Sequence, residues 1–361
     1  MNDVHGSEHL LALFPDELAA RLSAAGEPCD LRQARSLLSR LRGHRGDAPK
    51  RETTPRRLRE AVAALAEAGR PVVVDEVEDP ADGFVKLLFR AADGALFEVV
   101  RIPLERGRFT LCLSSQVGCG MGCVFCATGR LGLTRNLSAG EIVASFLTAR
   151  DGAPGPVTGA VFMGQGEPLH NYDAVLRAAR VLADPTGGRV AAEAITISTV
   201  GLVPEIHRYA REGHPFRLIV SLTSAVEARR RALLPIAKKH DLAALAGAVR
   251  AVQAARGGRV TVAWVTMAGV NCGDDEVEAL RALLGDVPLI VNLIDVNDAR
   301  PDGFRAPDAA ELDRFRDRLA ALGVPIVRRY SGGKARHAAC GMLARTRLAD
   351  DAAAQQEIAA P

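Results

Sequence analysis

Three cysteines lie close together in the middle of the chain, where Cys119, Cys123 and Cys126 form a C-x3-C-x2-C run. Three thiolates from one short loop can hold three irons of a cubane iron–sulfur cluster and leave the fourth iron open. Glycines beside and between the first two cysteines allow the loop to bend tightly around such a cluster. The run therefore predicts one 4Fe-4S cluster per chain with a vacant coordination position.

Zinc binding and disulfide bonds are the alternatives for these thiols. A structural zinc site usually takes four ligands, often from two C-x2-C pairs, and this run supplies one such pair with no His-rich partner nearby. The N-terminus has neither a positively charged region nor a long apolar run, so we expect no signal peptide. Seven cysteines, an odd number, then favour a reducing cytoplasm over a disulfide framework. Zinc remains the second interpretation.

The composition is that of a globular enzyme, but the basic residues are unevenly distributed. The 361 residues are 48% hydrophobic, and no apolar run reaches the length of a membrane span, so we expect no membrane partner. The net charge is only +3, yet one segment is strongly basic. Its cations are Arg32, Arg35, Arg40, Arg42, Arg45, Lys50, Arg51, Arg56, Arg57 and Arg59. They indicate either a solvated helical face or a surface that contacts nucleic-acid phosphates.

The hydrophobic period changes twice along the chain. Residues 1–70 have apolar side chains at three- and four-residue spacing, which predicts helices. Residues 71–105 resemble a small antiparallel meander with two turns. From residue 106 onward strands alternate with helices, which predicts a parallel sheet in an α/β fold. Polar motifs follow the strands, where barrel-like α/β folds carry their chemistry, and the tail at 346–361 has the composition of a disordered segment.

Several motifs together resemble the RlmN/Cfr family of radical S-adenosylmethionine (SAM) RNA adenine methyltransferases. The resemblance covers roughly residues 71–343. Its motifs are Cys112-Leu-Ser-Ser-Gln-Val-Gly-Cys119, Gly129-Arg-Leu-Gly-Leu-Thr-Arg-Asn136, Gly164-Gln-Gly-Glu-Pro-Leu-His-Asn171, Ile197-Ser-Thr-Val-Gly-Leu-Val-Pro204, Leu233-Leu-Pro-Ile-Ala-Lys-Lys239, Asn292-Leu-Ile-Asp-Val-Asn297 and Ala338-Ala-Cys-Gly341. The resemblance implies a partial (βα)6 TIM-like radical-SAM barrel at 106–345, a basic helical RNA-binding accessory domain at 1–70 and a β-meander linker at 71–105.

The resemblance also implies a SAM site beside the cluster. Cys119, Cys123 and Cys126 correspond to the cluster ligands, and the open iron would be chelated by SAM. The residues corresponding to SAM contacts are Gly166 and Glu167 for the amino group, Ser198 for the ribose, the segment Ser221, Leu222 and Thr223, and Asn297 at a later strand end. The family usually has a histidine in the segment that reads Ser-Leu-Thr here.

Two further cysteines and one glutamate correspond to the family's catalytic residues. Cys340 resembles the cysteine that carries the methyl group, and Cys112 its partner thiol. A radical formed from SAM would activate the methyl on Cys340, which adds to an adenine carbon. Glu98 would take the ring proton, and a transient disulfide between the two thiols would release the product. From its spacing on an apolar strand alone, Glu98 would be an exposed residue.

The resemblance implies structured RNA as the substrate, either 23S ribosomal RNA or transfer RNA, and an electron donor such as flavodoxin or ferredoxin. The sequence leaves open whether C2 or C8 of adenine is methylated. Two other functions remain as alternatives: a radical-SAM enzyme with the same core that acts on a peptide or small molecule, and a non-enzymatic, metal-bound RNA-binding protein.

Overall fold

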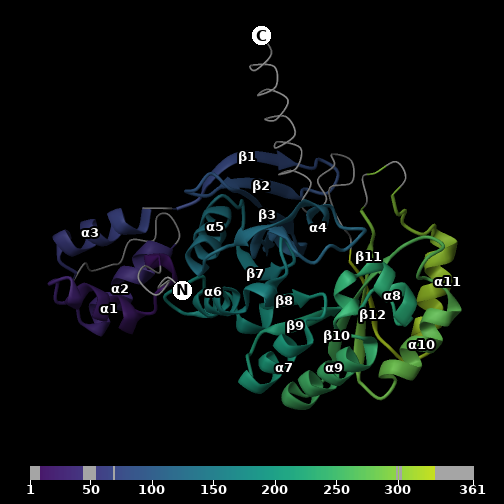
Figure 1. Cartoon of the computed structure of the whole chain (residues 1–361). Coiled ribbons are helices and arrows are strands. Elements are labelled where there is room, and N and C mark those ends of the chain that lie inside the picture. Colours follow the sequence, from purple (N-terminus) through teal and green to yellow (C-terminus); the bar gives the residue numbers. More distant parts are fainter. Residues whose placement is uncertain (1–8, 44–53, 68–69, 298–299, 301–302, 330–361) are drawn as a thin grey trace, which may run out of the picture.

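One large sheet organises most of the molecule. The structure, a computed structural model, describes residues 9–43, 54–67, 70–297, 300 and 303–329. The sheet has ten strands in the order β1-β2-β3-β4-β7-β8-β9-β10-β11-β12 (Figure 1). Their bounds are β1 Val72–Glu78, β2 Val85–Arg90, β3 Leu96–Pro103, β4 Phe109–Leu113, β7 Val157–Phe162, β8 Ile195–Thr199, β9 Arg217–Ser221, β10 Val260–Thr266, β11 Leu289–Asp295 and β12 Ile326–Arg329.

Within this sheet, the strands from β4 to β12 run parallel to one another. Parallel neighbours need a crossover connection, and helices provide it on the outside of the curved sheet (Figure 1). Those helices are α5 Ala139–Asp151, α6 Tyr172–Ala183, α7 Val203–Glu212, α8 Glu227–Leu233, α9 Leu242–Arg256, α10 Asp274–Leu284 and α11 Ala309–Ala320. The predicted α/β fold with a parallel sheet is confirmed, and the carboxyl ends of its strands share one edge.

The meander extends the parallel sheet. β1, β2 and β3 pair antiparallel with one another, and β3 pairs antiparallel with β4. In that last pair Val100 lies opposite Cys112. The meander is therefore joined to the barrel by a full ladder of backbone hydrogen bonds, and it forms a wall next to the strand that carries Cys112.

Alternation along β3 and β4 gives this wall two different faces. Val99, Leu111 and Leu113 are buried in the main core together with apolar residues of α5. Val100 and Cys112 point the other way and form a smaller apolar cluster with a neighbouring strand. Because successive side chains of a strand point to opposite faces, one face supports the fold and the other faces the barrel interior.

A short hairpin that the sequence did not predict carries the first cluster cysteine. β5 (Gln116–Cys119) pairs antiparallel with β6 (Gly132–Asn136), and the five-residue helix α4 (Ala127–Leu131) lies between them. Gly118 has φ of 75°, and a Cβ there would lie 2.1 Å from the Gly132 carbonyl oxygen. The close approach of the two strands therefore requires glycine at this position.

The N-terminal helices form their own small core against the barrel. They are η1 Leu10–Ala12, α1 Pro15–Ala24, α2 Leu31–Arg42 and α3 Arg56–Glu67. Leu10 and Leu13 belong to the helical core, whereas Leu11 and Ala12 are buried in the barrel core. The η1 segment is therefore shared between the two. Within the described residues, no helix has both the length and the apolarity needed to cross a membrane.

Arg42 of α2 connects the helical core to the barrel through hydrogen bonds. Its guanidinium is fully buried and donates hydrogen bonds to the carbonyl oxygens of Leu11, at 3.2 Å, and Leu13. A third contact, at 3.4 Å, reaches the Thr186 hydroxyl on the barrel. One side chain thus satisfies a backbone acceptor of η1 and one of the residue that follows it, which would otherwise be buried without these donors.

Arg42→Met is expected to lower the free energy of unfolding by about 2–4 kcal/mol, because two buried carbonyl groups lose their donors. Urea unfolding of the full chain measures the change. Arg32→Met, at an exposed position of the same helix, is the matched control and should leave the midpoint unchanged. Equal midpoints for both variants would contradict the assigned role of Arg42.

Candidate active site

A cavity of about 330 Å³ lies on the side of the sheet where the parallel strands end. Three sources line it: the cysteine loop, the ends of several strands, and the inner face of the meander and β4. Of the residues predicted from the sequence, those that line it are Cys112, Cys119, Cys123, Cys126, Gly166, Glu167, Ser198, Ser221, Thr223 and Asn297. The fold therefore gathers around one cavity residues that are spread over almost two hundred positions of the sequence.

The three cysteines of the run line one end of this cavity. Cys119 ends β5, and Cys123 and Cys126 follow in the turn before α4. The turn is held by a hydrogen bond from the Val124 amide to the Leu233 carbonyl oxygen at 3.1 Å. Among the described residues, no three His, Cys, Asp or Glu side chains converge closely enough to hold a single metal ion. All three cysteines line the same cavity.

Burial controls the protonation of two of these thiols. It raises the pKa of Cys119 to about 12, and it raises the pKa of Cys123 as well. Neighbouring cysteines add to both effects because like charges would repel. A positively charged iron cluster removes this penalty by coordinating the thiolates. Three thiols that open onto a common cavity fit three corners of such a cluster.

Glu167 is a buried carboxylate at the same end of the cavity. It is only 2% exposed, and it accepts hydrogen bonds from the Val200 amide at 2.9 Å and the Leu169 amide at 3.1 Å. Burial raises the pKa of Glu167 to about 7, although these backbone donors lower it in part. A cationic ligand group in the cavity would favour the ionised form, so the carboxylate suits an ammonium.

Gly166 provides the close backbone approach beside this carboxylate. Its φ of +99° lies where side chains are strained, and a Cβ would lie 2.5 Å from the Ser115 hydroxyl oxygen and 2.7 Å from Gln116 Cβ. Those two residues belong to the segment that leads from β4 into the cluster loop. Glycine at this position therefore lets the loop after β7 pack against the cluster loop.

Hydroxyl groups line the middle of the cavity at two neighbouring strand ends. Ser198 on β8 and Ser221 on β9 have their side-chain oxygens 3.4 Å apart. Thr223 follows directly, fully buried, and its hydroxyl has no hydrogen-bond partner among the described residues. A buried hydroxyl without a partner is unfavourable unless a ligand supplies one. Leu222 between them points into the main core and does not line the cavity.

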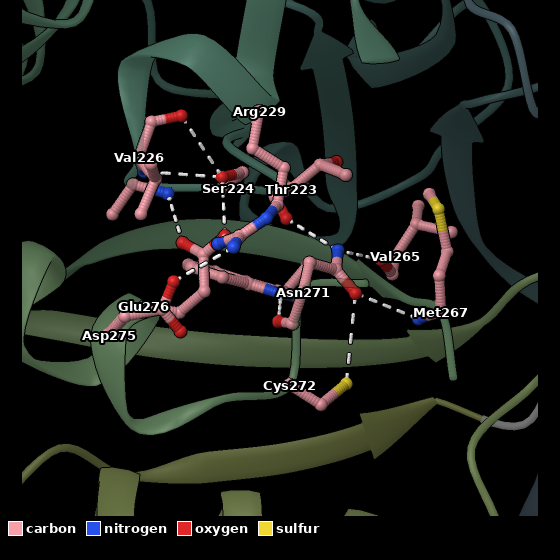
Figure 2. Close-up of polar contacts among 12 residues, drawn as sticks. Thr223, Ser224, Val226, Arg229, Val265, Met267, Asn271, Cys272, Asp275 and Glu276 are labelled. Atoms are coloured by element: carbon pink, nitrogen blue, oxygen red, sulfur yellow. Dashed lines mark hydrogen bonds and ion pairs between the residues drawn. The ribbon is translucent and has the colours of Figure 1, made fainter. Parts of the chain in front are cut away.

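Thr223 also has a strained backbone, with φ of 60°. The neighbouring structure holds it there. The Asn271 side-chain amide donates to the carbonyl oxygens of Thr223 and Val265, each at 2.7 Å, and its oxygen accepts from the Met267 amide at 2.8 Å (Figure 2). Asn271 is fully buried and saturated by these contacts. It fixes the loop after β9 to the end of β10.

The next residues of this loop are fixed by a second buried group. The Glu276 carboxylate accepts from the Ser224 hydroxyl at 2.5 Å, the Ala225 amide at 2.7 Å and the Arg229 guanidinium at 2.5 Å (Figure 2). Sequence reasoning missed both Asn271 and Glu276. The Gly-Val-Asn turn after β10 was a signal for Asn271, whereas Glu276 looked like an ordinary first-turn helix carboxylate.

Comparison with known proteins gives consistent matches. Residues 113–316 match the model of the radical SAM superfamily. A probable RNA methyltransferase of Anaeromyxobacter sp. (strain Fw109-5) is 51% identical over 94% of this chain and its own full length. The dual-specificity RNA methyltransferase RlmN of Anaeromyxobacter dehalogenans (strain 2CP-C) is 39% identical, over 95% of this chain and 94% of that protein.

A solved structure agrees with these relatives. The crystal structure of a radical SAM methyltransferase from Sphaerobacter thermophilus matches with a TM-score of 0.83 and 38% identity, and the match covers 93% of this chain and 99% of that one. The chain belongs to the RlmN-type family of the radical SAM superfamily. Membership of that superfamily implies a 4Fe-4S cluster and SAM as cofactors.

In this RlmN-type chain, β4 and the meander carry two of the remaining candidates, of which Cys112 lines the cavity and Glu98 does not. Cys112 is 5% exposed and lines the cavity beside Val100 and Val161. Glu98 lies two residues before Val100, on the same face of β3, and is 3% exposed. Its carboxylate is 3.7 Å from the Lys86 ammonium. The expectation of an exposed Glu98 was wrong, because the face of β3 from which Glu98 projects is covered, with Val100 buried on it and Lys86 beside the carboxylate.

Cys340 lies outside the described residues. Its predicted proximity to Cys112 therefore stays a prediction. The described residues do bring Cys112 to the same cavity as the cysteine run, which is the part of the expected arrangement that lies within them.

Gly166→Ala is expected to weaken SAM binding by more than about tenfold, because a Cβ would displace the cluster-loop segment or the loop that carries Glu167. Equilibrium dialysis with the cluster-loaded enzyme measures this. Gly247→Ala is the control, since a Cβ there meets no atom within 4 Å and alanine favours the helix. Unchanged SAM affinity in Gly166→Ala would contradict the assignment.

Proposed function

We propose that this protein transfers a methyl group from SAM, by way of a methylated Cys340, to an aromatic carbon of an adenine in structured RNA. The target is ribosomal RNA of the large subunit or transfer RNA. The observation that carries the proposal is the shared cavity, which is lined both by the three cluster-loop thiols and by the Cys112 thiol. The names of the RlmN-type relatives support RNA as the substrate class.

The residues at the cluster end would bind and orient the cofactors. Cys119, Cys123 and Cys126 would hold the cluster, and Glu167 would bind the amino group of SAM. When bound, the cluster and SAM supply the methyl group, the radical that activates it, and the electron exchange that the reaction requires. Ser198, Ser221, Thr223 and Asn297 would complete the SAM site, and the Thr223 hydroxyl would find its missing partner there.

Cys340, Glu98 and Cys112 would form the carbon–carbon bond and then release the methylated base. The activated methyl carbon on Cys340 bonds to the ring carbon, and Glu98 takes the ring hydrogen as a proton. The Cys112 thiolate then attacks the Cys340 sulfur. The S–S bond forms, the S–C bond breaks, and its electron pair stays on the former methyl carbon, which takes up a proton. A thiol on each side of the adduct is needed for this exchange.

The helical segment would contribute to RNA binding. Arg32, Arg35 and Arg40 are exposed on α2, and Arg56 and Arg57 on α3. Arg56 is paired with Glu60, and Arg57 with Glu27, so part of this charge is neutralised within the helices. Arg32 and Arg35 of α2 are therefore the better candidates for phosphate contacts. Turnover would need an electron donor of the flavodoxin or ferredoxin class.

The direct test is the nucleoside composition of RNA. Mass spectrometry of total ribosomal and transfer RNA from cells with and without this protein should reveal a methyladenosine that depends on the protein. Its chromatographic position against C2- and C8-methyl standards identifies the ring carbon. Identical nucleoside profiles from both cells, with the protein present and cluster-loaded in one of them, would overturn the proposed function.

Cys112→Ala is expected to trap a covalent RNA–protein adduct, because no thiol remains to attack the Cys340 sulfur. Free methylated RNA should fall by about 100-fold or more, and denaturing gels with labelled RNA should show the adduct. Cys29→Ala, at a buried position of the helical core, is the control. Normal release of methylated RNA from Cys112→Ala would refute the role given to Cys112.

A further inference from the structure

A fully buried arginine connects two strand ends at the cavity. Arg230 of α8 is 1% exposed. Its guanidinium donates hydrogen bonds to the carbonyl oxygens of Val200 at 2.7 Å and Ser221 at 3.0 Å, and to that of Leu222. Val200 directly follows β8, whereas Ser221 ends β9 and Leu222 follows it. One side chain therefore holds together the carboxyl ends of two neighbouring strands.

Both of these strand ends carry candidate SAM contacts. The Val200 amide donates to the Glu167 carboxylate at 2.9 Å, while the Val200 carbonyl oxygen accepts from Arg230. Ser221 lines the cavity, and its carbonyl oxygen accepts from the same guanidinium. The position of Glu167 relative to Ser221 therefore depends on Arg230, although Arg230 itself does not line the cavity.

The backbone beside Val200 leaves space for the guanidinium. Gly201 has φ of +114°, and a Cβ there would lie 3.1 Å from Arg230 Nη2. A guanidinium presents its N–H donors in a flat, rigid fork, whereas a lysine ammonium is a single point on a flexible stem. Arginine can therefore reach carbonyl groups of both loops at once, and lysine at position 230 would not hold both loops in the same geometry.

Arg230 is a buried cation without a carboxylate partner. Within the part of the chain that the structure describes, it donates only to backbone carbonyl oxygens and forms no ion pair. The Glu227 carboxylate, one turn earlier on α8, binds Arg231 instead, at 2.6 Å. Burial lowers the pKa of Arg230 to about 10, against the attraction of the Cys123 thiolate and of Glu227. The side chain thus stays charged at neutral pH, and a buried charge without a counter-ion is unfavourable.

The cluster loop packs against the elements that Arg230 connects. The Leu233 carbonyl oxygen, at the end of α8, accepts a hydrogen bond from the Val124 amide at 3.1 Å. Leu233 and Val200 both pack in the same apolar cluster as Cys123. Thiolates that hold an iron–sulfur cluster would supply negative charge near the guanidinium. Reduction adds one electron, and so one negative charge, to such a cluster, and a nearby buried cation favours that state.

We propose that Arg230 is a positioning residue for both cofactors: its guanidinium fork sets the spacing of the two SAM-binding strand ends, and its charge favours the reduced cluster. This inference rests on the assignment of the cavity to the cluster and SAM in the proposed function, and it adds to that function a residue outside the cavity. The two contributions are separable, because the fork is particular to arginine whereas lysine also carries the charge.

Two variants of the full-length, cluster-loaded protein separate the fork from the charge. Arg230→Met removes both, so SAM affinity in equilibrium dialysis should fall by more than about tenfold. The midpoint potential of the cluster, titrated with dithionite without SAM and followed by electron paramagnetic resonance, should become more negative. Arg230→Lys should also lose SAM affinity. Its midpoint potential at pH 7 should stay close to that of the unaltered protein, because an ammonium beside bound thiolates remains protonated.

Arg42→Met is the matched control for a purely structural role. Arg42 is the other fully buried arginine that donates to backbone carbonyl oxygens, and it lies at the junction with the helical core. Its loss should lower the unfolding midpoint and leave SAM affinity and the cluster potential unchanged. Arg231→Met removes an exposed cation from α8 and should leave both measurements unchanged, since solvent screens its charge.

Two results would overturn the inference. The first is unaltered SAM affinity in Arg230→Lys, which would refute the role of the fork even if Arg230→Met does not fold. The second is an unaltered midpoint potential in Arg230→Met, or in Arg230→Gln, which removes the charge but keeps a polar side chain. Neither measurement uses RNA. Absence of RNA methylation by the unaltered protein would therefore overturn the proposed methyl transfer and leave the role of Arg230 standing.

Discussion

The backbone pairing between β3 and β4 is the interaction on which the site depends. It joins an antiparallel meander to a parallel sheet, and its register sets Val100 opposite Cys112. Side chains alternate between the two faces of a strand, so a slip of one residue would turn Glu98 out of the interior and bring in a side chain from the apolar face. The chemistry assigned to this wall is thus controlled by hydrogen bonds between backbone groups that take no part in it.

Low polarity inside the cavity makes its ionisable groups depend on nearby opposite charges. Burial raises the pKa values of Cys119 and Glu167, so ionisation of each group is unfavourable unless an opposite charge lies nearby. Iron would supply that charge for the thiols, and an ammonium would supply it for the carboxylate. In the meander the protein itself places the Lys86 ammonium 3.7 Å from the Glu98 carboxylate. The counter-charges for Cys119 and Glu167 would thus come from cofactors, whereas Glu98 has one within the protein.

The sequence predicted the parallel strands because each is a short run of apolar, often β-branched residues ending in polar motifs. It did not predict the β5–β6 hairpin, whose glycines and charged residues have no regular period. The cysteine run and the Gly166–Glu167 pair could be identified from residue type and order. Burial of Glu98 and its contact with Lys86 could not, because both depend on which strands become neighbours. The support that Asn271 gives to Thr223 is likewise tertiary, since it joins residues almost fifty positions apart.

The η1 segment bears on how the enzyme can be divided for laboratory work. This segment and the residue after it contribute to two interiors: Leu10 and Leu13 pack in the helical core, and Leu11 and Ala12 pack in the barrel core. The Ala12 carbonyl also accepts a hydrogen bond from Arg177 of α6 at 3.0 Å. A fragment that starts at the meander would lack Leu11 and Ala12, so its core would contain a cavity and the apolar residues around that cavity would be exposed. A shortened catalytic fragment would need to retain η1 or carry a replacement that fills the same space.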